Sequence, residues 1–180
     1  AIEAEEPEIS EVTLALSTFY RTSLNRGETM TTMESELNNI KAYLQIQLIM
    51  HDDNFKVIED VDSNTFSYQV PKLMLQPLVE NAIEHGLDTS EKEEKSLWIT
   101  ISQDEDTLYL SVRDNGTGMK QEKAEQIATY HSKGYGVRNV NDRIVLLYGE
   151  EYGLRVTSSE GEGTCVEFRI PKDTGGCNSW

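Results

Sequence analysis

The sequence predicts a two-layer α/β sandwich, in which a mixed, mainly antiparallel sheet is covered by about three helices and preceded by two more. Two observations support this α+β prediction. Two pairs of short apolar runs are each joined by a polar turn, which is typical of antiparallel hairpins. Before and between them lie longer segments whose apolar residues recur every three or four positions, as on one face of a helix.

The two leading helices are predicted before residue 52. Residues 8–26 show helical spacing, and Gly27 would end that helix. Thr31-Thr32-Met33-Glu34 forms a capping box that would open the second helix. The apolar face of the second helix would consist of Met33, Leu37, Ile40, Leu44 and Leu48. Two interpretations stay open. One is an ordinary amphipathic helix, and the other is helix packing or a dimer face through Leu37, Ile40, Leu44 and Ile49.

A strand and a central helix are predicted next. Residues 55–61 largely alternate between apolar and polar side chains, which indicates a strand. Pro71 suits the first turn of a helix that runs through residues 73–85 and ends at Gly86. Pro77 lies inside that helix and would either bend it or mark its real start.

Two hairpins and a last helix complete the prediction. The hairpins would pair residues 97–102 with 108–113 and residues 154–158 with 165–170. Between them, a polar stretch over residues 119–133 precedes a helix that runs from the Gly134-Tyr135-Gly136 segment through Tyr148. Gly149 would end that helix.

The charge balance excludes several classes of partner. The chain has 32 acidic and 16 basic residues, which gives a formal net charge of -16. A surface for DNA, RNA or an anionic membrane needs an excess of Lys and Arg, so we expect no nucleic-acid partner. A small phosphate ligand stays possible, because backbone N–H groups and Mg²⁺ can hold it.

Cysteine content and the termini indicate a cytoplasmic fragment. Cys165 and Cys177 match no metal motif and are too few for a disulfide framework, so reduced thiols are expected. No apolar run approaches the roughly 18 residues of a membrane span. The acidic N-terminus does not resemble a signal peptide, and without an initiating Met the chain is expected to come from a longer protein.

The first candidate block is Glu80-Asn81, in the middle of an otherwise apolar helix. Polar groups beside a core-facing surface are costly unless they are paired. One interpretation makes the Asn81 oxygen a Mg²⁺ ligand and lets Glu80 act on a metal-bound water or on the attacking group. The other is a surface Glu beside a hydrogen-bonded Asn.

The second block, Asp114-Asn115-Gly116-Thr117-Gly118, directly follows a predicted strand. Glycines at alternate positions let the backbone adopt positive φ and approach a ligand closely. Asp114 could accept a hydrogen bond from an exocyclic amine. A plain Asp-Asn-Gly turn is the alternative.

The third block, Gly134-Tyr135-Gly136-Val137, opens a helix, and helix N-termini bind anions. Lys133, Arg138 and Arg143 lie nearby in the sequence. A single G-x-G is a weak signal by itself. The chain contains no G-x-x-x-x-G-K-[ST], which argues against a P-loop.

In order and spacing, the three blocks resemble the N-box, D-x-G-x-G box and G-x-G box of the GHKL ATPases. That superfamily includes type II topoisomerases, a heat-shock chaperone ATPase, mismatch-repair ATPases and histidine kinases. Gly163-Thr164 is similar to its last glycine–threonine element. The segments 75–86, 134–149 and 42–47 resemble one class of bacterial sensor histidine kinase, whose phosphoacceptor block has the approximate form P-H-F-x-x-N.

The resemblance implies the GHKL (Bergerat) fold and a role for each site residue. Asp114 would accept from the adenine amino group, with Thr164 supporting it through a water. Asn81 would bind Mg²⁺ and, with Glu80, form the catalytic pair. Residues 119–133 would be a lid. The other nucleotide contacts would come from Glu84, His85, Gly116, Gly118, Met119, Lys133, Gly134, Tyr135, Gly136 and Val137.

The resemblance also implies an activity and partners. The domain would bind Mg-ATP and transfer the γ-phosphate to a histidine on the acceptor helix of the same or a partner kinase chain. The phosphate would then pass to a response regulator. The full-length protein would be a homodimeric, membrane-anchored sensor with this domain in the cytoplasm.

One departure concerns the acceptor histidine. His51, His85 and His131 do not lie in an acceptor block, which we therefore expect before Ala1. Residues 1–52 would be the tail of the dimerisation and phosphotransfer region, residues 53–172 the ATP-binding domain and residues 173–180 a loose tail. The chain would then bind ATP without phosphorylating itself.

Two other functions stay open. One is a nucleotide-binding regulatory module without transfer activity. The other is a helical dimerisation module in which the sheet is only a scaffold. The intact residues of the three blocks argue against the first of these, namely Asn81, Asp114, Gly116, Gly118, Gly134 and Gly136.

Overall fold

The computed structural model describes residues 29–51, 54–127 and 135–172. Its main sheet has five strands in the order β2-β4-β5-β7-β6, and a small second sheet pairs β1 with β3. In the main sheet β2 runs parallel to β4, and the other neighbours are antiparallel. The strands are β1 (Met30–Thr32), β2 (Phe55–Val61), β3 (Gln69–Pro71), β4 (Lys95–Gln103), β5 (Thr107–Asp114), β6 (Arg155–Ser159) and β7 (Gly163–Pro171).

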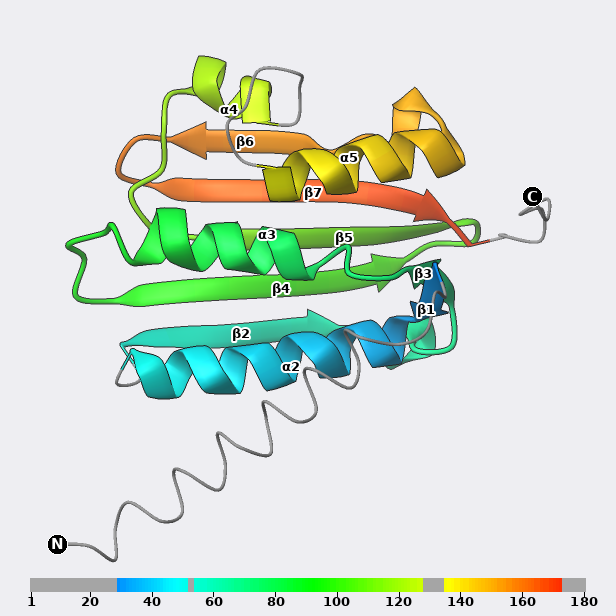
Figure 1. Cartoon of the computed structure of the whole chain (residues 1–180), viewed down its shortest axis with the longest axis horizontal. Helices are drawn as coiled ribbons and strands as arrows, with labels where there is room; N and C mark the ends of the chain where they lie inside the picture. Colours follow the sequence, from blue (N-terminus) through cyan, green and yellow to red (C-terminus); the bar gives the residue numbers. More distant parts are fainter. Residues whose placement is uncertain (1–28, 52–53, 128–134, 173–180) are drawn as a thin grey trace, which may run out of the picture.

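Helices cover one face of this sheet, so the predicted two-layer sandwich is confirmed. Figure 1 shows α2, α3 and α5 lying side by side across the sheet, with α4 beside β6. The helices are α2 (Met33–Met50), α3 (Gln76–Asn81) with its π-helical continuation η2 (Ala82–Leu87), α4 (Gln121–Ile127) and α5 (Tyr135–Tyr148), with short 3₁₀ turns η1 (Ser63–Thr65) and η3 (Glu150–Tyr152). Among the described residues, no helix combines the length and apolar character that crossing a bilayer requires.

Strand alternation explains why one face is covered. On β4 and β5, every second side chain is buried against the helices, namely Leu97, Ile99, Ile101, Leu108, Leu110 and Val112. The intervening residues of both strands are more exposed. This period of two is the one that the sequence predicted for both hairpins, and both are confirmed.

The second leading helix belongs to the same hydrophobic core as the sheet. Met33, Leu37, Ile40 and Leu44 of α2 are buried in one cluster with residues of α3 and of the strands, and Leu48 packs against it. The apolar face of α2 is therefore used within the chain, as in an ordinary amphipathic helix. The hydrophobic core therefore contains residues from both sides of residue 52. The domain boundary that the sequence predicted at residue 52 stays a prediction. The helix predicted over residues 8–26 and its stop at Gly27 lie outside the described residues.

The predicted start of α2 was wrong by one residue. Thr32 is the N-cap, and its Oγ1 accepts the Ser35 N–H at 3.2 Å, whereas the predicted box began at Thr31. Thr31 is instead paired with Val70 in the β1–β3 sheet. This pairing lies nearly 40 residues away in the chain, so no local sequence pattern could reveal it.

The predicted start and end of the central helix also need correction. Pro71 ends β3, Leu73 adopts a φ of 57°, and the helix begins only at Gln76. Pro77 therefore lies in the first turn, which was the second of the two predicted possibilities. The helix passes Gly86 in π-helical geometry and ends at Leu87.

A buried carboxylate from α2 holds the segment that leads into α3. Glu36 is 2% exposed, and its two carboxylate oxygens accept the N–H groups of Leu73 at 2.9 Å and Leu75 at 3.0 Å. Burial raises the pKa of Glu36. These two N–H groups, the N–H group of Met74 and the positive charge of Arg143 act in the opposite direction and lower the pKa. Leu75 is the N-cap of α3 and has no side-chain acceptor, so Glu36 supplies one from another helix.

Replacing Glu36 with alanine tests this contact. Glu36→Ala leaves two N–H groups without their acceptor, so we expect the free energy of unfolding in urea to fall by about 2 kcal/mol or more. Glu34→Ala, on the exposed side of the same helix, should change it by less than about 0.5 kcal/mol. Equal losses in the two variants would contradict the capping role.

Candidate functional site

The site is built around Asp114, the last residue of β5. Its side chain is 3% exposed, and its Oδ1 accepts the Gly116 N–H at 2.8 Å. Burial raises the pKa of Asp114 above its ordinary value, and the backbone N–H groups of Gly116 and Thr164 oppose that rise. The D-x-G-x-G block therefore folds back on its own carboxylate instead of forming a plain exposed turn.

Two glycines let the end of the central helix pack on this block. A Cβ atom on Gly116 would lie 2.2 Å from the carbonyl carbon and oxygen of Gly86. A Cβ atom on Gly86 would lie 2.6 Å from Oδ1 of Asp114. The Thr117 N–H donates to the Gly86 carbonyl at 3.2 Å and fixes the contact. Sequence analysis predicted Gly86 only as a helix stop and missed this close approach.

The β6–β7 turn closes the site from the other side. Gly118 and Gly163 have φ angles of 59° and 106°, which disfavour any side chain. A Cβ atom on Gly163 would lie 2.1 Å from the Asp114 carbonyl oxygen, and one on Gly118 would lie 1.9 Å from that of Ser159. The predicted Gly163-Thr164 element thus lies directly beside Asp114.

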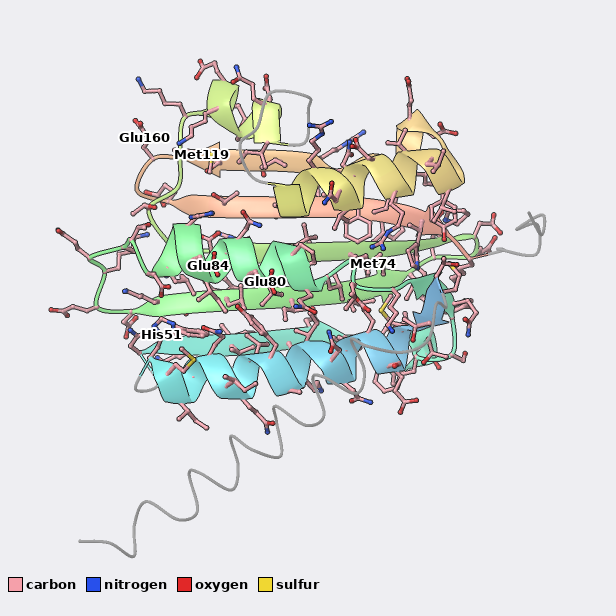
Figure 2. The ribbon with its side chains drawn as sticks, viewed as in Figure 1. His51, Met74, Glu80, Glu84, Met119 and Glu160 are labelled. Carbon is pink, nitrogen blue, oxygen red and sulfur yellow. The ribbon has the colours of Figure 1, made fainter. Side chains whose placement is uncertain are left out.

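Ser158 links Thr164 to Met119, and sequence analysis did not find it. Its Oγ donates to the Gly163 carbonyl at 2.9 Å, lies 2.9 Å from the Thr164 hydroxyl and accepts the Met119 N–H at 2.9 Å. Figure 2 labels Met119 beside this turn. A serine in a short strand has no distinctive spacing, so the sequence offered no signal for it.

The Glu80-Asn81 block lies on the central helix, with both side chains half-buried. Asn81 donates through Nδ2 to the Pro77 carbonyl at 2.6 Å, which leaves its Oδ1 for another partner. Glu80 Oε1 accepts from Gln76 Nε2 at 2.7 Å. Both polar groups are therefore partnered by their own helix.

The start of α5 reaches Asn81. A Cβ atom on Gly136 would lie 3.2 Å from Cβ of Pro77 and 3.6 Å from Nδ2 of Asn81. Val137, the next residue, is 2% exposed and anchors the turn in the core. The structure thus brings the first and third blocks together, while Lys133, Gly134 and the side chain of Tyr135 lie outside the described residues.

Glu84 and His85 are exposed on the second half of the central helix. The His85 carbonyl accepts the hydroxyls of Thr89 at 2.9 Å and Thr117 at 3.3 Å. Burial raises the pKa of Tyr43 on α2, and the charges of Glu80, Glu84 and Asp88 raise it further. The carboxylates of Glu80 and Glu84, both labelled in Figure 2, therefore lie near α2.

Arg138 and Arg143 were predicted only to lie near the third block. Arg138 forms an ion pair with Asp142 at 3.4 Å. Arg143 acts on the buried Glu36 carboxylate of α2. Neither contact involves residues of the three blocks.

The donor set fits a nucleotide better than a metal held by protein alone. Among the described residues, no group of three or more His, Cys, Asp and Glu side chains could hold an ion. Mg²⁺ commonly uses one or two protein oxygens together with phosphates and waters. The Oδ1 atom of Asn81, close to a helix N-terminus that suits phosphate, matches that pattern.

Comparison with protein families gives two matches. Residues 69–174 match the family described as histidine kinase-, DNA gyrase B-, and HSP90-like ATPase. Residues 1–55 match the family described as histidine kinase.

Among similar proteins, the sensor histidine kinase YesM of Bacillus subtilis is 30% identical over 167 residues, which cover 93% of this chain and 28% of that protein. The sensor protein kinase HptS of Staphylococcus aureus is 30% identical over 166 residues, which cover 89% of this chain and 32% of that protein. The chain thus spans less than a third of the length of these relatives.

Solved structures show the same fold. A histidine kinase domain from a blue-light-activated kinase of Erythrobacter litoralis matches with a TM-score of 0.58 and 20% identity, covering 92% of this chain and 75% of that one. The catalytic domain of the histidine kinase ThkA matches with a TM-score of 0.60 and 21% identity, covering 80% and 95%. The predicted GHKL-type sandwich is confirmed at the level of the fold.

The raised pKa of Asp114 predicts how stability depends on pH. Below the ordinary pKa of 3.8 the Asp114 carboxyl is neutral in both the folded and the unfolded chain. Its contribution to the free energy of unfolding is then fully present. As pH rises through the higher folded-state pKa, the buried group ionises and this contribution is lost. Urea unfolding should therefore show Asp114→Asn gaining stability relative to the unsubstituted chain as pH rises from 3.8.

Asp104→Asn is a matched control, because the pKa of Asp104 is shifted in the opposite direction from that of Asp114. The hydrogen bond from Tyr109 lowers the pKa of the exposed Asp104, so its carboxylate contributes stability above pH 3.8 and loses it as pH falls. The Asp104→Asn variant should lose stability relative to the unsubstituted chain as pH rises. The same trend in both variants would contradict the assignment for Asp114.

Proposed function

The chain belongs to the histidine kinase-, DNA gyrase B-, and HSP90-like ATPase family, and we propose that it is the Mg-ATP-binding catalytic domain of a sensor histidine kinase. The observation that supports this most is the buried Asp114 carboxylate, enclosed by glycines from three segments that leave no room for side chains. Relatives named as a sensor histidine kinase and as a sensor protein kinase align over about nine-tenths of the chain.

Asp114 recognises the adenine ring in this proposal. Its Oδ1 is held by the Gly116 N–H, so the carboxylate is oriented to accept from the exocyclic amine. Thr164 supports the same contact through a bridging water. Gly116, Gly118 and Met119 contribute the backbone beside the ring and ribose, and the two glycines let this backbone pack against Gly86 and Ser159.

The phosphates bind at the start of α5. The backbone N–H groups of Gly134, Tyr135, Gly136 and Val137 and the helix dipole attract anions, and Lys133 adds a positive charge. Asn81 gives its Oδ1 to Mg²⁺, since its Nδ2 is already bound to the Pro77 carbonyl. Glu84 and His85 provide further contacts from the central helix, and the segment 119–133, which includes α4, acts as a lid.

The reaction is phosphoryl transfer to a histidine nitrogen. The unprotonated ring nitrogen attacks the γ-phosphorus, a new N–P bond forms, and the bond to the β,γ-bridging oxygen breaks so that ADP leaves. The other ring nitrogen then loses its proton, and Glu80 is the carboxylate that receives it. Mg²⁺ supplies neutralisation of phosphate charge, and the protein contributes orientation and backbone dipoles.

The remaining proposals concern the whole protein. The acceptor histidine lies on a helix outside this chain, in the same or a partner kinase subunit. The phosphate passes on to an aspartate of a response regulator. Residues 1–52 belong to the dimerisation and phosphotransfer region of a homodimeric sensor that is anchored in a membrane, and residues 53–172 form the cytoplasmic ATP-binding domain.

A second candidate is a nucleotide-binding regulatory module that transfers no phosphate. One observation favours it: Glu80 and Asn81 both have partners on their own helix, as expected for residues without a catalytic role. Nucleotide binding without any transfer to an added acceptor helix would distinguish this candidate.

The adenine contact can be tested by calorimetry. Asp114→Ala removes the carboxylate, so affinity for a non-hydrolysable ATP analogue should fall roughly 10- to 150-fold, because a hydrogen bond to a charged group is lost. Asp104→Ala, on the exposed hairpin turn, is the control and should leave affinity unchanged. Unchanged affinity in a folded Asp114→Ala chain would refute the adenine assignment.

The metal role of Asn81 is tested by titrating with and without Mg²⁺. Asn81→Ala should weaken binding of the Mg²⁺-bound analogue roughly tenfold or more, since a metal ligand is lost. Binding of the metal-free analogue should change less than about twofold, because the Oδ1 atom then has no ion to hold. Equal losses in both titrations would show that Asn81 acts on the fold or the nucleotide and not on the metal.

A further inference from the structure

A line of hydrogen bonds crosses from α2 to the Glu80 carboxylate. Asn39 Nδ2 donates to Gln76 Oε1 at 2.9 Å, and Gln76 Nε2 donates to Glu80 Oε1 at 2.7 Å. Asn39 is 2% exposed although it is polar and lies beside the apolar face of α2. A buried amide is costly unless it is paired, so its placement against Gln76 calls for a role.

The direction of these hydrogen bonds is set by Glu80, because a carboxylate only accepts, whereas each primary amide has an oxygen end that accepts and a nitrogen end that donates. Gln76 therefore turns its nitrogen to Glu80, and its oxygen faces Asn39 and accepts from Nδ2 there. Without Asn39 the Gln76 oxygen would lose its buried donor, and the Gln76 side chain could leave the rotamer that contacts Glu80.

The backbone under Gln76 is held by the same helix. Glu36 lies three residues before Asn39 on α2 and binds the N–H groups of Leu73 and Leu75, just before Gln76 begins α3. Gln76 and Glu80 are four residues apart, the spacing at which helical side chains meet. Helix α2 therefore fixes both the backbone and the side chain of the residue that contacts Glu80.

We propose that Asn39 and Gln76 are positioning residues for phosphoryl transfer, which hold the Glu80 carboxylate in one orientation. Gln76 occupies Oε1, so Oε2 is the oxygen left to receive the proton from the attacking imidazole. This inference rests on the proposed function, because the role of Glu80 belongs to it. A purely structural link between α2 and α3 would involve the same bonds but would not act through Glu80.

A first test needs no nucleotide. In a ¹⁵N-labelled chain, the Gln76 side-chain proton that is donated to Glu80 should exchange slowly with solvent, since it is hydrogen-bonded and Asn39 holds the amide in place. Asn39→Leu should speed this exchange and shift the Gln76 signals, whereas Asn38→Ala, an exposed neighbour, should not. Gln76 signals typical of a free amide in the unsubstituted chain would overturn the proposal.

The second test is a double-mutant cycle on the transfer rate. The chain is given labelled Mg-ATP at saturation and a peptide with a P-H-F-x-x-N acceptor block. Gln76→Met, which keeps the length but cannot donate, should lower the rate roughly 10- to 100-fold with nucleotide affinity within about twofold. Asn39→Leu should lower it less, and Asn38→Ala should not change it.

The cycle separates positioning from structure. If Gln76 acts through Glu80, adding Gln76→Met to Glu80→Gln should cause no further loss. If Gln76→Met lowered the transfer rate equally in the unsubstituted chain and in the Glu80→Gln variant, the positioning role would be overturned. A lower transfer rate that is explained by weaker nucleotide binding would overturn it as well. A chain that binds nucleotide but transfers nothing even without substitutions would instead refute the proposed transfer function, and the positioning role with it.

Discussion

The buried carboxylate of Asp114 lies where three backbone segments meet without side chains between them. Gly86 lies in the last turn of the central helix, Gly116 belongs to the loop that follows Asp114, and Gly163 comes from the β6–β7 turn. Any Cβ atom at these positions would overlap backbone or the carboxylate itself. The contact therefore fixes the helix end, the loop and the turn relative to one another, and with them the part of the site around Asp114.

Helix α2 is the second determinant of the site, although the sequence motifs lie elsewhere. Its apolar residues complete the core, and its buried Glu36 supplies the acceptor that the start of α3 lacks. Its Asn39 orients Gln76 toward Glu80. A movement of α2 would therefore be transmitted to the half of the site that contains Glu80 and Asn81, while Asp114 would keep its own contacts.

Local patterns predicted the strands of the main sheet, both hairpins and the three blocks, because alternation, helical spacing and glycine placement are properties of neighbouring residues. The local patterns failed where a contact between residues far apart in the chain determines the local structure. Pro71 suits a helix start but is paired in β3 with Met30, and Thr31 cannot cap α2 because it belongs to β1. Glu36, Ser158 and Asn39 could not be predicted as site supports, since each acts on a segment more than 30 residues away in the chain.

The most direct measurement is a titration of the ¹⁵N-labelled chain with a non-hydrolysable ATP analogue and Mg²⁺, followed by NMR. The account predicts saturable shifts that are largest at Asp114, Gly116, Gly118, Asn81 and Gly136, because these residues surround one proposed ligand. Shifts confined to the open face of the sheet, at residues such as Trp98, Tyr109 and Arg113, or no shifts at millimolar nucleotide, would contradict it.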